Sequence, residues 1–259
     1  MSNERPPPPP VVRYGDHPDQ VANLHLPAGQ GRSWPCVVLV HGGFWRERWD
    51  RTVMTPLAID LARRGLACWN LEYRRVGQDG GGWPGTLEDV AAGIDALRGV
   101  SEVDADRVVV VGHSAGGQLA LWSAARRRLP RGAPGARPVV VPRAAVSQAG
   151  VCDLAAGSHE NLGDGAVDAF LGGSPESHPN RYAVASPTAL LPLGVPQLLV
   201  HGSRDEDVPL SQSREHLAAA KAAGDEVGLL ELDADHFDVI DPEHAAWHEV
   251  AGRLTSLLL

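Results

Sequence analysis

The chain has 259 residues, which at about 150 residues per domain allows one or two domains. With 43% hydrophobic and 21% charged residues, its composition is that of a globular protein, so any disorder is confined to short segments. Acidic residues outnumber basic ones by 32 to 23, and the resulting formal charge of −9 argues against nucleic acid or an anionic membrane as a partner.

The three cysteines, Cys36, Cys68 and Cys152, are odd in number and fit no C-x-x-C spacing, which is typical of a reducing compartment. No run of eighteen apolar residues occurs, and the start MSNERPPPPP lacks the apolar stretch of a secretory signal. We therefore expect a cytoplasmic protein with no membrane span.

Five consecutive prolines, residues 6–10, predict an extended, disordered arm over residues 1–12. Beyond the arm, short β-branched runs alternate with longer amphipathic stretches, which predicts one α/β domain over residues 13–259. Near-continuous apolar runs such as VVLV and VVVV are typical of strands buried on both faces. The expected fold is therefore a mostly parallel central sheet flanked by helices on both faces.

The predicted strands cover residues 20–26, 36–41, 67–72, 107–112, 144–148, 197–201 and 226–232. Helical spacing is found near residues 53–61 and 87–94, and helices are also predicted over 114–128, 211–223 and 242–258. The segment 150–193 is rich in Gly, Pro, His and Asn and contains only one short helical phrase, VDAFL. Because long connections in compact domains are usually functional or mobile, we expect a small cap-like excursion beside the site.

A candidate nucleophile lies in the sequence Gly112-His113-Ser114-Ala115-Gly116, which matches G-x-S-x-G. The pentapeptide is weak evidence by itself, and an ordinary Gly/Ser turn is the alternative interpretation. Its position between a predicted strand and a predicted helix strengthens the case, because such a turn exposes the serine above the carboxyl end of the sheet.

A serine hydroxyl needs a base to activate it and a carboxylate to orient that base. Two phrases that follow predicted strands supply both: H-G-S-R-D-E-D-V-P at 201–209 and D-A-D-H-F at 233–237. The carboxyl ends of strands in an open α/β sheet are where ligands bind. His236 is the candidate base, and Asp205 and Asp207 are both candidates for the acid.

With these motifs in place, the chain resembles the α/β-hydrolase-fold serine hydrolases. It is most similar to the esterase/lipase and arylformamidase (kynurenine formamidase)-like branch, which carries an H-G-G oxyanion motif. The matching phrases, which extend from about Tyr14 to the end of the chain, are H-G-G-F-W at 41–45, E-Y-R-R at 72–75, the serine turn, H-G-S-R-D-E-D-V-P and D-H-F-D at 235–238.

The resemblance implies a role for each matching residue. Ser114 would be the nucleophile, His236 the general base, and Asp205, ahead of Asp207, the acid that orients His236. The oxyanion hole would be formed by backbone N–H groups of Ala115 and of the loop Gly42, Gly43 and Phe44. His41 would hold this loop in place rather than act as a base.

Aromatic residues in neighbouring loops, Phe44, Trp45 and Trp83, are candidates for the walls of an apolar substrate pocket, although each could equally be a residue at the edge of the core. His244 and His248 lack the Glu of a H-E-x-x-H metal motif, and no nucleotide-binding Gly-rich motif occurs. We therefore expect no metal and no cofactor.

The sequence thus predicts a serine hydrolase that cleaves a small carboxylic ester through an acyl-enzyme. Two alternatives keep this mechanism and change the bond: an arylformamidase that hydrolyses N-formylkynurenine, and an acyl peptidase. An alternative from another class is a ligand-binding protein of the same fold without turnover.

Overall fold

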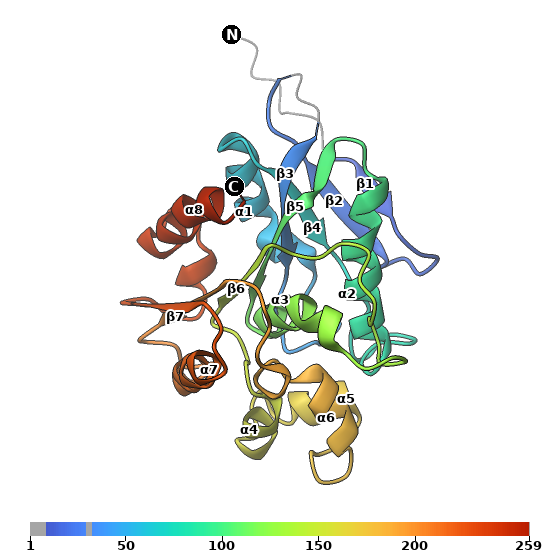
Figure 1. Ribbon diagram of the computed structural model, residues 1–259, viewed down its shortest axis with the longest axis vertical. Helices are drawn as coiled ribbons and strands as arrows, with labels where there is room; N and C mark the ends of the chain where they lie inside the picture. Colours follow the sequence, from blue (N-terminus) through green and yellow to red (C-terminus); the bar gives the residue numbers. More distant parts are fainter. Residues whose placement is uncertain (1–8, 30–32, 259) are drawn as a thin grey trace.

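The computed structural model describes residues 9–29 and 33–258, and its centre is a sheet of eight strands within those residues (Figure 1). The strands are β1 (Val11–Arg13), β2 (Val21–His25), β3 (Trp34–Val40), β4 (Ala67–Leu71), β5 (Val103–His113), β6 (Ala144–Gln148), β7 (Gln197–Gly202) and β8 (Val227–Leu232). Their order across the sheet is β1-β2-β4-β3-β5-β6-β7-β8. All seven predicted strands are present, with ends shifted by a few residues.

The sheet is mostly parallel, as predicted. The pairs from β4 through β3, β5, β6 and β7 to β8 are parallel, whereas β1 and β2 join the edge in antiparallel pairs. This arrangement, with helices on both faces, is the predicted α/β-hydrolase fold. The assignment of residues 13–259 to one domain stays a prediction.

The predicted arm over residues 1–12 is too long. Val11 and Val12 belong to β1, where they pair with Asn23 and Ala22 of β2. The proline run ends at residue 10, and the two β-branched residues that follow can donate to a ladder, which prolines cannot. The first eight residues of the predicted arm lie outside the described part of the chain.

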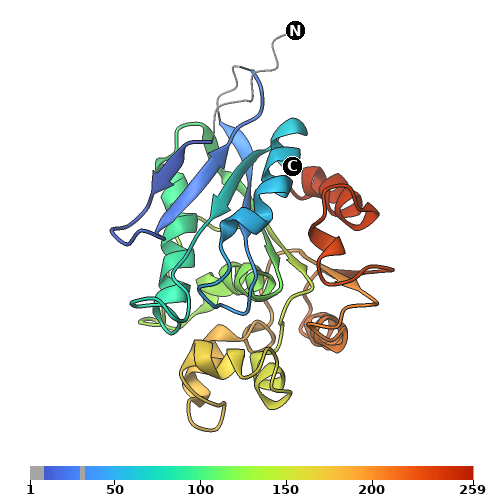
Figure 2. The same cartoon turned by 180° about the vertical axis from the view of Figure 1, so that it is seen from behind.

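Helices cover both faces of the sheet, as predicted (Figures 1 and 2). Alternate side chains of β3 explain why: Val38 packs in the core under α2 and α3, whereas its neighbour Leu39 packs in the core under α1 and α8. These four helices are α1 (Thr55–Arg63), α2 (Gly85–Asp95), α3 (Ala115–Ala125) and α8 (Ala245–Leu258), and α7 (Ser211–Ala222) packs against β7 and β8.

Short 3-10 helices adjoin several of these elements, namely η1 (Arg51–Met54), η2 (Ala96–Gly99), η3 (Arg126–Arg128), η4 (Thr188–Leu190) and η5 (Asp238–Ile240). The predicted helix over 114–128 therefore consists of α3 followed by η3. The last predicted helix begins three residues later than expected. Within residues 9–29 and 33–258, no helix is both long and apolar enough to cross a membrane.

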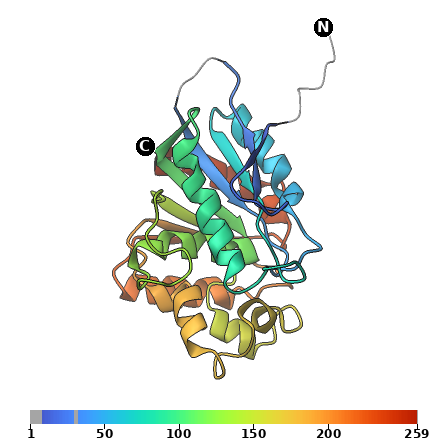
Figure 3. The same cartoon turned by 90° about the vertical axis from the view of Figure 1, so that its right-hand side faces the viewer.

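The excursion over residues 150–193 leaves the carboxyl end of β6 and is more helical than predicted. It contains α4 (Leu154–His159), α5 (Ala166–Leu171) and α6 (Pro179–Ala185), which gather at the lower end of the molecule in Figure 3. Each helix has only six or seven residues, too few for a clear sequence period. Burial of Leu154, Phe170 and Leu171 in the core stabilises these helices instead.

Candidate active site

Ser114 lies in the sharp turn between β5 and α3, with φ 56° and ψ −120°. A positive φ is strained for a residue other than glycine. The turn needs glycines on both sides of Ser114, because the backbone of neighbouring residues is too close for a side chain. A Cβ added to Gly112 would lie 1.9 Å from the oxygen of Gly116, and one added to Gly116 would lie 2.1 Å from the oxygen of Val40. The strand, turn and helix predicted around the serine are confirmed.

His236 and Asp205 lie in the loops that follow the neighbouring strands β8 and β7. Nδ1 of His236 donates to Oδ2 of Asp205 at 2.7 Å, and the Asp205 side chain is completely buried. Its other oxygen, Oδ1, accepts hydrogen bonds from the N–H groups of Asp207 and Val208, each at 2.9 Å. The side chain of Asp207 is exposed. Of the two acids that the sequence left open, Asp205 is the one that forms a hydrogen bond with His236.

His201, on β7, supports Asp205 from a second side. Its Nε2 lies 2.9 Å from the oxygen of Val208 and 3.3 Å from Oδ2 of Asp205, and its Nδ1 bonds to the hydroxyl of Ser213 at 2.7 Å. Burial alone would raise the pKa of Asp205, but the hydrogen bonds from His201 and His236 hold that pKa far below its usual range. This role of His201 was not predicted, although His201 opens the phrase that contains Asp205.

The H-G-G segment follows β3 and borders the serine. A Cβ added to Gly42 would lie 2.8 Å from Cβ of Ser114, and Gly43 has φ +107° with no room for a Cβ beside the ring of Trp49. The N–H groups of Gly43 and Ala115 make no hydrogen bond to any residue within 9–29 and 33–258. Within the described residues, both N–H groups are thus unpaired donors, and Gly43 lines the same pocket as Ser114.

Buried polar side chains hold the H-G-G segment in place. His41 bonds through Nε2 to Oε1 of Glu72 and through Nδ1 to the oxygen of Gly42, each at 2.8 Å, and its ring stacks on Tyr73 at 4.4 Å. Arg75 donates to the same Glu72 oxygen. Burial would raise the pKa of Glu72, but the charges of His41 and Arg75 keep it below its usual value. The contacts place His41 in the support of the loop rather than at the reacting centre.

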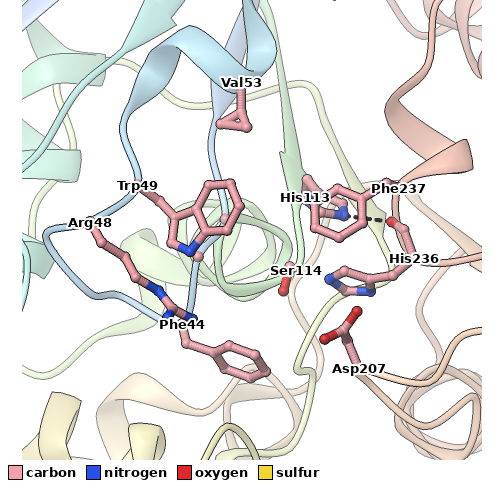
Figure 4. A pocket seen from close by; sticks show the side chains of 11 residues that line it. Phe44, Arg48, Trp49, Val53, His113, Ser114, Asp207, His236 and Phe237 are labelled. Atoms are coloured by element: carbon pink, nitrogen blue, oxygen red, sulfur yellow. Dashed lines mark hydrogen bonds between the residues drawn. The ribbon is translucent and has the colours of Figure 1, made fainter.

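A small cavity of about 60 Å³ opens beside Ser114 (Figure 4). In Figure 4 the side chains of Ser114 and His236 face each other, with Asp207 next to the ring of His236. Three aromatic rings, those of Phe44, Trp49 and Phe237, contribute to the walls. The complete lining is Gly42, Gly43, Phe44, Arg48, Trp49, Val53, His113, Ser114, Asp207, His236 and Phe237.

Among the aromatic residues predicted to line the pocket, Phe44 does so and the other two do not. Trp45 is completely buried, stacks on Phe170 with ring centres 4.7 Å apart, and donates to Gln118. Trp83 packs under the guanidinium of Arg181 at 5.6 Å. Phe44 and Trp45 both have positive φ, 52° and 55°, and this bend turns their adjacent side chains to different surroundings.

Several lining residues were not predicted. Trp49 and Val53 come from the loop and 3-10 helix before α1, and no sequence signal links them to the site. His113 and Phe237 are different, because each is the direct neighbour of a predicted catalytic residue. Trp49 and Phe237 face each other with ring centres 6.3 Å apart.

Within the described part of the chain, residues 9–29 and 33–258, one group of ligating atoms is close enough to hold a cation: those of Asp205, Asp207 and His236, which lie within 4.8 Å of one another. Nδ1 of His236 already bonds to Asp205, whose other oxygen accepts two N–H groups. This arrangement fits an acid–base pair better than a cation site. The expectation that the protein needs no metal stays a prediction.

Known proteins resemble the chain in sequence. It is 29% identical over 201 residues to esterase LipQ of Mycobacterium tuberculosis, covering 75% of this chain and 47% of that protein. It is 28% identical over 279 residues to the isoprenylcysteine alpha-carbonyl methylesterase ICME of Arabidopsis thaliana, covering 95% of this chain and 61% of that protein. The chain thus spans about half to three fifths of these relatives.

Solved structures share the fold over nearly the whole chain. A truncated carbohydrate esterase from gut microbiota superposes with a TM-score of 0.80 at 17% identity, covering 95% of this chain and 94% of that one. The propionate-bound esterase 2 of Thermogutta terrifontis gives 0.77 at 21% identity, covering 97% and 94%. A family model named BD-FAE matches residues 22–220. Because this match covers more than half of the sequence, the chain belongs to the BD-FAE family and has the α/β-hydrolase fold.

Proposed function

We propose that the protein is a serine esterase that hydrolyses small carboxylic esters through an acyl-enzyme. The observation that carries the proposal is the hydrogen bond from His236 to the buried carboxylate of Asp205, with the ring of His236 facing Ser114 across the pocket. This is the arrangement that a serine nucleophile needs, because a carboxylate that fixes the tautomer of the histidine leaves Nε2 free to accept the hydroxyl proton.

In the first step, Oγ of Ser114 attacks the carbonyl carbon of the ester while Nε2 of His236 takes the hydroxyl proton. The negative oxygen of the tetrahedral intermediate is bound by the N–H groups of Gly43 and Ala115. His236 then gives the proton to the alcohol oxygen, the ester C–O bond breaks, and the acyl group remains on Ser114. A water molecule, deprotonated by His236, then attacks the carbonyl carbon of the acyl-enzyme. The bond from the acyl group to Oγ of Ser114 breaks, the acid leaves, and His236 returns the proton to Ser114.

The H-G-G loop can contribute more than one donor. Gly42 and Phe44 flank Gly43, and the N–H of Phe44 also lacks a hydrogen-bond partner within the described residues, 9–29 and 33–258. We assign the oxyanion hole to this loop together with Ala115. The His41 and Glu72 pair below the loop keeps these groups in place, since a donor must be fixed before the charge develops.

The size of the pocket favours a short acyl chain. A cavity of about 60 Å³ has room for only about four water molecules. A wider opening of about 630 Å³ shares Asp207, His236 and Phe237 with this pocket, and it is also bordered by the polar residues Arg204, Glu206 and Asp235. We therefore place the acyl group in the small pocket and the alcohol part of the ester toward the wider opening.

The names of the relatives support ester hydrolysis. LipQ is an esterase and ICME is a methylesterase, although each is considerably longer than this chain. The arylformamidase, acyl peptidase and non-catalytic alternatives, and the cytoplasmic location, stay predictions. A comparison of kcat/KM for N-formylkynurenine and for short esters separates the first alternative from the proposal.

The proposal is tested with p-nitrophenyl acetate and with a fluorophosphonate that labels activated serines. We expect turnover and labelling by the wild type and neither by Ser114→Ala. Ser101→Ala is the matched control, since Ser101 is exposed and, among residues 9–29 and 33–258, its hydroxyl bonds only to Glu102. Equal turnover by the wild type and Ser114→Ala would refute the assignment, and absence of labelling in the wild type would favour the non-catalytic alternative.

A further inference from the structure

Two side chains outside the proposed triad connect the serine turn to the loop of His236. His113 immediately precedes Ser114 at the end of β5, and Gln148 ends β6 directly beside it in the sheet. Nε2 of His113 bonds to the backbone oxygen of His236 at 2.8 Å. Nε2 of Gln148 donates to the backbone oxygen of Val239, three residues further along the same loop.

Gln148 is bonded both to the turn that carries Ser114 and to the loop that carries His236. Its backbone oxygen accepts the N–H of Ser114 at 2.8 Å, while its side chain holds Val239. One residue therefore fixes the strained turn of the nucleophile and the loop of the base. The Oε1 atom of Gln148 is buried and has no hydrogen-bond partner among the described residues, 9–29 and 33–258, so the side chain bonds here through its N–H group alone.

His113 lies between three parts of the site. Its ring centre is 4.6 Å from that of His236 and 5.7 Å from that of Phe237, and a Cβ added to Gly42 would lie 3.1 Å from its Nδ1. Because a carbonyl oxygen only accepts, Nε2 of His113 carries the proton. The side chain is buried and its ring packs against the ring of His236.

We infer that His113 and Gln148 are positioning residues that hold the loop of His236 at the distance from Ser114 that proton transfer requires. The inference rests on the proposed function and adds to it, since both side chains bond to the backbone of the His236 loop and neither bonds to the side chain of Ser114 or His236, although His113 also lines the pocket. Displacement by about 1 Å of a group that transfers a proton costs on the order of a hundredfold in rate. Loss of either bond lets the loop move and so lowers kcat with little effect on substrate binding.

The neutral state of the His113 ring supports this role. Burial, and next the nearby charge of His236, lower the pKa of His113 to about 3. His113 therefore stays neutral when His236 gains a proton in the reaction. A neutral donor can hold the loop through both protonation states of His236 without adding repulsion.

The experiment compares variants that keep or remove the donor. Gln places its amide nitrogen close to the position of Nε2 of His, so His113→Gln keeps the bond and His113→Leu removes it. Gln148→Met removes the second bond together with the unpartnered Oε1, which limits the loss of stability. His216→Leu is the matched control, because His216 is equally buried but bonds to Thr188 and Gln197.

With p-nitrophenyl acetate we expect His113→Leu and Gln148→Met to lower kcat by about tenfold to a hundredfold with KM within about twofold. We expect His113→Gln to recover kcat to within about threefold of the wild type, and the control to keep kcat per folded molecule. Equal kcat in His113→Leu and the control would overturn the inference, as would equal loss in His113→Gln and His113→Leu.

A second readout does not depend on turnover. The proton between Nδ1 of His236 and Asp205 gives a ¹H resonance downfield of the amides, assigned by its loss in Asp205→Asn. We expect this resonance in the wild type and His113→Gln, and its broadening or loss in His113→Leu and Gln148→Met, as the loop opens to water. A sharp, unshifted resonance in the last two variants would overturn the inference even if the wild type proved inactive on every ester.

Discussion

The Nδ1–H group of His236 points at Oδ2 of Asp205, 2.7 Å away, and this carboxylate cannot turn away because its other oxygen is held by two backbone N–H groups. Asp207 follows two residues later and is exposed at the pocket. The same short loop thus presents one buried acid that is bonded to the base and one exposed acid that is not. Substitution of Asp205 and substitution of Asp207 are therefore expected to have different effects on kcat.

Asp205→Asn is expected to lower kcat by about 10⁴-fold, because an amide can donate to Nδ1 and so stabilise the wrong tautomer of His236. Asp207→Asn, the matched control two residues away, is expected to stay within about threefold of the wild type. Steady-state kinetics with p-nitrophenyl acetate measure both values. Normal turnover in Asp205→Asn combined with loss of turnover in Asp207→Asn would show that the acid is misassigned.

Trp49 sets the size of the pocket beside Ser114, since its ring forms one wall and faces Phe237. We expect the wild type to prefer short acyl chains, of about two to four carbons. Trp49→Ala is expected to open the cavity, so that the preferred acyl chain lengthens to about six carbons or more. The measurement is kcat/KM across p-nitrophenyl esters of increasing chain length. Trp83→Ala is the control, because Trp83 packs under Arg181 instead of lining the pocket. A profile that shifts in Trp83→Ala and not in Trp49→Ala would contradict this assignment.

Gly43→Ala tests the oxyanion loop. Gly43 has φ +107°, and the added Cβ would lie 2.4 Å from the side chain of Trp49, so the loop must shift its N–H groups. We expect kcat to fall by about a hundredfold to a thousandfold. Gly65→Ala is the matched control: its φ is +86°, but the added Cβ meets no atom of the described residues within 4 Å. It should lose about 1 kcal/mol of stability and keep its kcat. A similar kcat in the two variants would refute the role of the loop.

The sequence predicted the sheet well because buried parallel strands have a simple signature. The apolar runs in β3 and β5 are continuous. The sequence did not predict the elements whose stability comes from tertiary contacts. Strand β1 has only three residues and exists by pairing with β2, and α4 to α6 are too short to show a period.

In the site, the sequence identified residues whose chemistry depends on their place at the end of a strand. Ser114, Asp205 and His236 all follow strands whose positions are visible in the sequence, and the structure brings them together. The pocket walls depend instead on loop conformation. Two successive positive φ angles direct Trp45 into the core, and Trp49, four residues later, lines the pocket, which no sequence pattern predicts.

The buried carboxylate of Glu72 is expected to stabilise the fold as well as the loop. Its side chain is 1% exposed and pairs with His41 and Arg75. Because its pKa is lowered in the folded state, the stabilisation is complete above the unfolded pKa of about 4.5 and is lost as pH falls through the folded value. Glu72→Gln should cost about 3 to 5 kcal/mol at pH 7, since it leaves buried charge without its partner.

Urea unfolding of the wild type and Glu72→Gln at a series of pH values measures this contribution. The difference between their free energies of unfolding should be constant from pH 7 to about 5 and should narrow at lower pH, because the wild type then loses its ionised carboxylate. Glu102→Gln, at an exposed position, should match the wild type throughout. A difference that stays constant down to pH 3 would mean that the variant acts through packing and not through the charge of Glu72.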